Sequence, residues 1–198
     1  MTVLEDRIAM ADTDTDANTQ RLDDWFERLE RMPVPEGFRV EIVGGDVFMT
    51  PQRGTHWQII FRIAGAVAEK HGMDRVLSDV RIDFPGHENG FCPDVAMLKE
   101  SAEPDAGGRW RHEDVEFVAE VISRGTAAND YGPKRIAYAD AEVPVYLIAD
   151  PYQGRCHVHT DPKEGDYARV TRVDFGTDVD LTGTVADLVL KTDAFPRG

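Results

Sequence analysis

One segment constrains the fold more than any other. The apolar runs "VEFVAEVI" (115–122) and "PVYLIAD" (144–150) flank "NDYGPKRIAYADA" (129–141). The outer runs have the composition of strands, and the middle segment has the pattern of a helix, with Asp130 as its expected N-cap and Pro133 in its first turn. A strand, a helix and a strand in succession form a crossover. Together with the hairpin patterns below, it predicts an α/β (mixed α+β) fold whose mixed central sheet is flanked by helices.

Antiparallel elements surround this crossover. "FRVEIVGGDVFMT" (38–50) indicates a hairpin because both turn residues, Gly44 and Gly45, accept positive φ. "RCHVHT" (155–160) and "YARVTRV" (167–173) indicate another, in which His157 and His159 are expected to be exposed strand positions.

Helical patterns occur upstream of the crossover. "THWQIIFRIAGAVAEKHG" (55–72) predicts a helix with Thr55 as N-cap and Gly72 as its end. A second pattern predicts an amphipathic helix over about 20–32. The acidic residues 1–18 have too few apolar side chains to build a core and are expected to be disordered. We therefore expect one domain over 19–198, with a core at about 34–173 and a C-terminal extension at 174–198.

The net charge is −15, from 37 acidic and 22 basic residues, which disfavours nonspecific binding to a polyanion.

No apolar run approaches the roughly 20 residues of a membrane span, and the N-terminus does not resemble a signal peptide, so no membrane partner and a cytoplasmic location are expected. Cys92 and Cys156 are too few for a disulfide framework and are expected to be buried free thiols.

Glu120 is an acidic residue inside a run that otherwise predicts a buried strand, where an unpaired carboxylate costs several kcal/mol. Asp94, in "CPDVAML" (92–98), begins another apolar run. Carboxylates on neighbouring strands can offset each other's cost by holding a hard divalent cation. The alternative is that each is a structural hydrogen-bond acceptor.

Three basic side chains are candidates to assist such a site. Lys134 follows the Glu120 strand closely enough for its ammonium to fold back toward it and stabilise charge on a phosphate, although most lysines are solvated. His56 can contact substrate or transfer a proton, or can serve as a helix-terminal packing residue. Arg124, in the loop after Glu120, can meet a phosphate or remain in solvent.

The motifs "CPDVAML", "FVAEVISRGTAANDYGPKRIAYADAEVPVYLIADP" and "FRVEIVGGDVFMTP" followed by "THW" resemble the Uma2 family of endonucleases, a branch of the PD-(D/E)xK nuclease superfamily. The resemblance covers about residues 34–160. It implies a restriction-endonuclease-like core. By this resemblance, Asp94 and Glu120 hold Mg²⁺, with Mn²⁺ as a substitute, and Glu41 lies near the metal.

Ile122 stands where the superfamily has a lysine, and the resemblance gives that role to Lys134. The expected activity is metal-dependent endonucleolytic hydrolysis of phosphodiester bonds. The expected substrate is DNA, and a homodimer is left open. The alternative is a catalytically silent nuclease scaffold that binds or regulates, which the negative charge favours.

Overall fold

The computed structural model describes residues 3–32, 38–51 and 53–198, with side chains from residue 17 onward. Its helices are α1 (Val3–Glu30), α2 (Gly54–His71), η1 (Met73–Arg75), η2 (His112–Asp114), α3 (Ala127–Tyr131) and α4 (Pro133–Asp140). Its strands are β1 (Phe38–Val43), β2 (Asp46–Pro51), β3 (Val76–Leu77), β4 (Ile82–Phe84), β5 (Asn89–Phe91), β6 (Val95–Leu98), β7 (Trp110–Arg111), β8 (Val115–Val121), β9 (Val145–Asp150), β10 (Arg155–Lys163), β11 (Asp166–Asp174), β12 (Val179–Asp180) and β13 (Val189–Leu190).

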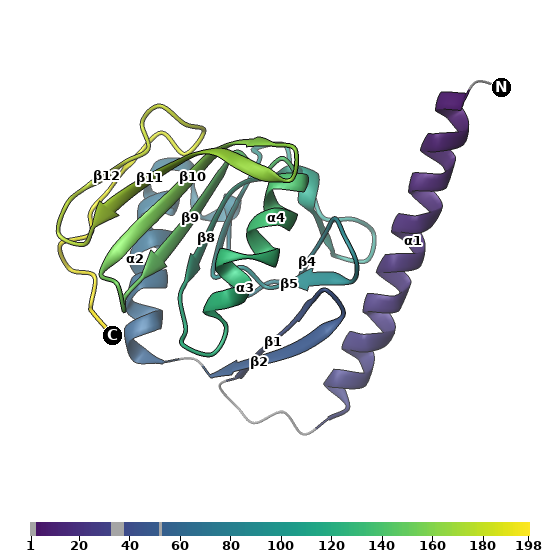
Figure 1. The fold of residues 1–198 in the computed structure, drawn as a ribbon, viewed down its shortest axis with the longest axis horizontal. Helices are drawn as coiled ribbons and strands as arrows, with labels where there is room; N and C mark the ends of the chain where they lie inside the picture. Colours follow the sequence, from purple (N-terminus) through teal and green to yellow (C-terminus); the bar gives the residue numbers. More distant parts are fainter. Residues whose placement is uncertain (1–2, 33–37, 52) are drawn as a thin grey trace.

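The strands form two larger sheets. The six-stranded sheet has the order β11-β10-β9-β8-β6-β3, and the five-stranded sheet has the order β2-β1-β5-β4-β7 (Figure 1). In the six-stranded sheet β8 and β9 are parallel and are joined by α3 and α4, while the other pairs are antiparallel. The predicted mixed sheet with a helical crossover is confirmed. The second sheet is mixed as well, because β4 and β7 pair in parallel.

Helices cover both faces of the six-stranded sheet, with α2 on one side and α3 and α4 on the other (Figure 1). Alternate residues of β8 divide between these layers, as the pleat of a strand requires. Ala119 and Val121 join the apolar cluster that includes α2. Val118 and Ile122 join the cluster that includes α4. Glu120 points toward the α4 layer and shares its face with Ile122.

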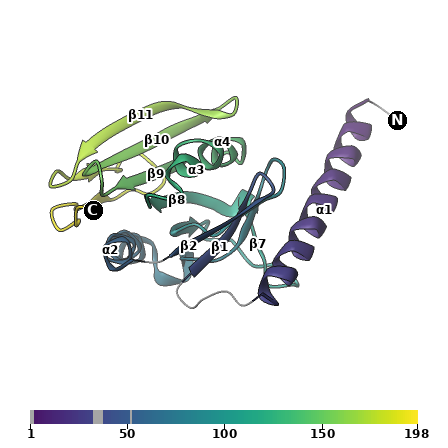
Figure 2. The ribbon, with the colours of Figure 1, turned by 60° about the horizontal axis from the view of Figure 1, so that its bottom comes forward.

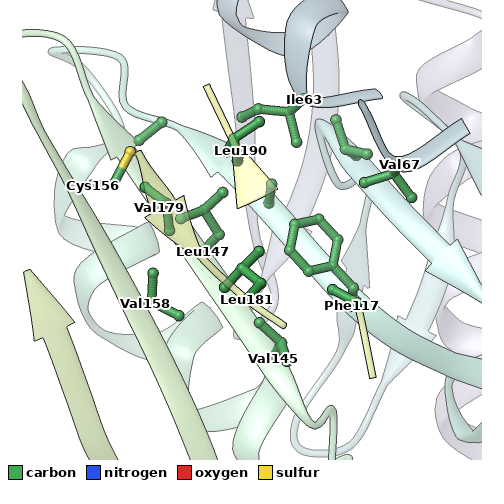
Figure 3. Close-up of a cluster of buried hydrophobic side chains, with 14 of the residues drawn as sticks. Ile63, Val67, Phe117, Val145, Leu147, Cys156, Val158, Val179, Leu181 and Leu190 are labelled. Atoms are coloured by element: carbon green, nitrogen blue, oxygen red, sulfur yellow. The ribbon is translucent and has the colours of Figure 1, made fainter. Parts of the chain in front are cut away.

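The C-terminal segment completes the core on the α2 side. Val179, Leu181 and Leu190 pack with Leu147 and Phe117 in one buried cluster (Figure 3). The segment 174–198, expected as an extension, therefore contributes to the main apolar core. Its strands β12 and β13 pair with each other in a small separate sheet.

The predicted hairpin turn at Gly44 and Gly45 is confirmed, with φ values of 61° and 84°. The structure differs from the sequence predictions at two helices. The expected helix over 129–141 is divided into α3 and α4 at Gly132, since Pro133 lacks an N–H and disfavours α-helical backbone in the residue before it. The N-cap of α2 is Arg53, with no side-chain cap, in place of Thr55.

The helix expected at about 20–32 lies inside the longer α1, whose C-terminal half docks on the five-stranded sheet through Leu22 and Leu29. Its N-terminal end projects away from both sheets (Figure 2). Residues 3–18, expected to be disordered, are the first part of this helix, and residues 1–2 lie outside the described residues. Extending a helix that is already docked adds one hydrogen bond for each residue ordered, which favours continuation.

The prediction that His157 and His159 are exposed is wrong. Both imidazoles are buried because α4 packs against β10 and β11 on that face. The ring of His157 lies 5.4 Å from that of Tyr131, and the ring of His159 lies 5.7 Å from that of Tyr146.

Cys92 and Cys156 are buried free thiols, as predicted. Among the described residues, no helix has the length and apolar character needed to cross a membrane.

Candidate active site

Asp94 and Glu120 lie side by side because β6 and β8 pair in register. Val95 is opposite Ala119 in this antiparallel ladder, which brings the residue before Val95 next to the residue after Ala119. The backbone N–H of Asp94 donates to Glu120 Oε2 at 3.3 Å, and the N–H of Val121 donates to Asp94 Oδ2 at 2.7 Å. Both side chains are only 1% exposed. The strand pairing therefore buries two adjacent carboxylates.

Lys134 extends from α4 into this pair. Its Nζ donates to Glu120 Oε1 at 2.9 Å and to both oxygens of Glu41, at 2.8 and 3.0 Å. The hydroxyl of Tyr138, one turn later on α4, donates to the same Oε1 of Glu120 at 2.7 Å. Burial alone lowers the pKa of Lys134, but the nearby carboxylates outweigh it and hold that pKa above its usual value. The ammonium is therefore charged at neutral pH.

Glu41 and Arg39 reach the site from β1 of the five-stranded sheet. They are two residues apart on a strand and therefore share a face. The Arg39 guanidinium donates through Nη1 to Asp94 Oδ1 and to the Cys92 carbonyl, and its Nη2 lies 3.5 Å from Glu41 Oε2. Cys92 N–H in turn donates to Glu41 Oε1 at 2.9 Å. The site is thus assembled between the two sheets.

His56 enters from the first turns of α2 on the other side. Its Nε2 lies 2.5 Å from the Val121 carbonyl oxygen and 3.4 Å from Asp94 Oδ2. A carbonyl can only accept, so Nε2 donates in this contact. Nδ1 is buried and has no hydrogen-bond partner among the described residues.

Asp130 was expected to cap a helix, but its buried carboxylate lies inside α3 with Oδ1 3.5 Å from Lys134 Nζ. We call Glu41, Asp94, Glu120 and Asp130 the carboxylate cluster. With all four ionised, it exceeds the positive charge of Arg39 and Lys134 by two. Burial raises the pKa of Asp130 well above its usual value; Lys134 opposes this rise and the other carboxylates add to it. The raised pKa favours the protonated form of Asp130, which reduces the excess of negative charge.

The carboxylate cluster satisfies part of what a divalent cation requires. Its oxygens are the hard ligands that Mg²⁺ prefers. However, no group of three or more His, Cys, Asp or Glu side chains has a metal-binding arrangement within the described part of the chain. Mg²⁺ commonly keeps several waters and takes only one or two carboxylates, so Asp94 and Glu120 fit the ion as a pair.

The structure thus brings together five of the predicted site residues: Glu41, Asp94, Glu120, Lys134 and His56. Arg124 is not among them, because its guanidinium is exposed and lies over the ring of Tyr152 at 4.9 Å. Sequence reasoning missed Arg39 and Asp130 as members of the site. Both had a detectable signal: Arg39 shares the strand face of Glu41, and Asp130 is four residues before Lys134 on a predicted helix.

The protein is a mixed α/β protein in which buried acidic side chains and a lysine meet between two sheets. A family model described as "Uma2: Putative restriction endonuclease" matches residues 26–193. The chain belongs to the Uma2 family.

A solved structure, one of several that match, resembles the chain over most of its length. It is the crystal structure of a putative nuclease belonging to DUF820 from Anabaena variabilis, 14% identical, with a TM-score of 0.66 over 88% of this chain and 96% of that one. At this identity the likeness shows the fold. No curated protein matches the sequence.

Proposed function

We propose that this protein is a divalent-metal-dependent endonuclease that hydrolyses phosphodiester bonds, with DNA as its substrate. The observation that carries the proposal is the ammonium of Lys134, which joins Glu120 and Glu41 beside Asp94 in one buried acidic cluster. The family description and the nuclease name of the structural relative support the same reaction class.

In this proposal Asp94 and Glu120 hold Mg²⁺, or Mn²⁺ in its place, and Glu41 supports them through Lys134. When bound, the ion neutralises charge on the phosphate. Lys134 is placed to stabilise charge that develops during phosphodiester cleavage, and His56 is proposed to contact the substrate or transfer a proton. Arg39 donates to Asp94 Oδ1, so its positive charge competes with a cation for that oxygen. Arg124 is proposed as a phosphate contact outside the cluster.

The side of the cluster nearest to solvent is formed by Arg39, His56 and Asp79. The Asp79 side chain is 43% exposed and lies 3.9 Å from Arg39 Nε, while Arg39 and His56 are each 8% exposed as residues. Substrate is therefore expected to approach between β1 and the N-terminal end of α2.

The alternative is a nuclease scaffold that binds or regulates without turnover. One observation favours it: each oxygen of Glu41, Asp94 and Glu120 already accepts a donor from the chain itself. A silent protein could retain such a satisfied polar cluster for structure alone.

The two functions are separated by plasmid cleavage with Mg²⁺ or Mn²⁺ and with EDTA. The proposed enzyme cuts in the presence of metal, and Glu120→Gln loses the activity while keeping its circular dichroism spectrum. The matched control is Glu116→Gln, on the same strand, where the carboxylate pairs with Arg75 and should not affect cleavage. Cleavage by Glu120→Gln at the wild-type rate would overturn the assigned site. No cleavage by wild-type protein in either metal supports the silent scaffold.

A further inference from the structure

An aromatic pair is exposed on the outer face of α2, directly beside the proposed active site. The rings of Trp57 and Phe61 stack with centroids 5.1 Å apart and planes 19° apart. Trp57 is 54% exposed and Phe61 is 62% exposed, whereas the opposite face of the helix packs into the core through Ile59, Ile60 and Ile63. Single exposed apolar residues are common, but two large stacked rings on one helix face mark an interaction surface.

The aromatic pair begins at the residue that follows His56, a member of the candidate site. His56 turns inward to Asp94, and the next residue, Trp57, turns outward to solvent. Trp57, Phe61 and Gly65 follow one another at intervals of four residues and so form one stripe along α2, and Arg53 is the N-cap residue just before the helix. A side chain added at Gly65 would meet nothing within 4 Å, so the stripe remains open beyond Phe61.

The segment that carries the pair has a charge opposite to that of the whole protein. No acidic residue occurs from Val47 to Ala68, although the chain carries a net charge of −15. Arg53 and Arg62 are exposed in this stretch, and neither has an ion-pair partner among the described residues. An anionic ligand that also presents flat rings fits this surface better than an acidic protein does.

We propose that Trp57 and Phe61 are a stacking platform for unpaired nucleotide bases, with Arg53 and Arg62 contacting the flanking phosphates. The inference rests on the proposed function and specifies its substrate class as a strand that is single-stranded or locally opened. Bases within a duplex have their faces covered by neighbouring bases, whereas unpaired bases offer a free face to an aromatic ring. The platform would hold such a strand beside His56 and the carboxylate cluster.

The test measures fluorescence anisotropy of a labelled single-stranded oligonucleotide of about 12 nucleotides in EDTA, where the proposed cleavage does not occur. Trp57→Ala and Phe61→Ala should each weaken binding by about tenfold to a hundredfold, as for the loss of one base-stacking contact. The matched control is Trp25→Ala, a 37% exposed tryptophan on α1, which should bind as wild type does. An abasic strand of equal length should be insensitive to Trp57→Ala but weakened by the double variant Arg53→Gln/Arg62→Gln.

Three results would overturn the platform: no binding by wild-type protein, unchanged affinity in Trp57→Ala/Phe61→Ala, or an equal loss for the abasic strand. A dimer that dissociates in Trp57→Ala without any change in oligonucleotide affinity would also overturn it and identify a protein interface. Cleavage of the plasmid and of the single-stranded oligonucleotide with Mn²⁺, measured in parallel, separates this proposal from the proposed function. Cleavage without base-dependent binding would contradict only the stacking platform. Base-dependent binding without cleavage would support the platform and contradict the proposed nuclease function.

Discussion

Nζ of Lys134 lies 2.9 Å from Oε1 of Glu120, and both side chains are almost completely buried. The same ammonium contacts Glu41, so one lysine on α4 neutralises acids from both large sheets. Lys134 therefore has a structural role in addition to the proposed catalytic one, and the two roles have different measurable consequences.

Lys134→Ala should destabilise the fold, because it leaves buried carboxylates without their counter-charge. Removal of one partner from a buried ion pair costs about 3–5 kcal/mol, which urea unfolding can measure. The control is Lys191→Ala, whose exposed pair with Asp178 should contribute nothing measurable. Equal stability of wild type and Lys134→Ala would contradict the ion-pair role. Full cleavage by a folded Lys134→Ala protein would contradict the catalytic role.

Mg²⁺ or Mn²⁺ should raise the melting temperature, since a ligand that binds only the native state stabilises it by mass action. The double variant Asp94→Asn/Glu120→Gln keeps the shape of both side chains and removes the charges that would hold the ion. It should show no shift on addition of metal. The same shift in both proteins would place the metal elsewhere.

Arg39→Gln should increase the affinity for Mn²⁺ measured by titration calorimetry. The guanidinium donates to Asp94 Oδ1, an oxygen proposed to hold the ion, and also lies near Glu41. Removing its charge increases the negative charge excess and frees the oxygen, while the amide can still donate to the Cys92 carbonyl. Arg75→Gln, which removes a guanidinium from the pair with Glu116, is the control. Weaker Mn²⁺ binding by Arg39→Gln would show that Arg39 orients the acids and does not compete with the ion.

Stability should fall in mild acid because of His159. Burial lowers the pKa of this imidazole to about 4, from an ordinary value of 6.5. The native state therefore favours the neutral form, and its stabilising contribution is complete above about pH 6.5 and is lost as pH falls toward 4. Urea midpoints between pH 7 and pH 4 should decline less steeply in His159→Gln than in wild type. The control His87→Gln, at an exposed position, should follow the wild-type curve.

Docking of α1 should depend on the absence of a side chain at Gly90. A Cβ at this position would lie 2.7 Å from Phe26 Cε2 and 3.3 Å from Leu22 Cδ2. Gly90→Ala should therefore destabilise the protein by about 1–3 kcal/mol, the usual cost of overpacking. Gly65→Ala, in open space on α2, should be neutral or stabilising by up to about 1 kcal/mol. A neutral Gly90→Ala would mean that α1 can shift on the sheet without cost.

Local patterns in the sequence predicted many of the helices and strands and named several residues of the candidate site. The spacing of apolar residues along 115–122 places Glu120 and Ile122 on one strand face, because that alternation is a property of a single strand. The paired glycines at 44 and 45 specify their turn in the same way. The family motifs named Asp94, Glu120 and Lys134 as candidates. The helical pattern over 129–141 was less reliable, because Pro133 divides it into α3 and α4.

Which charges meet depends on the packing of elements that are distant in the sequence. The register of β6 on β8 brings Asp94 to Glu120, and packing between the two sheets brings Arg39 and Glu41 to the same place. Likewise, α4 covers the strand face that buries His159. Such contacts join residues far apart in the chain, so they depend on how layers pack rather than on local periodicity, and the burial that shifts each pKa arises only from that packing.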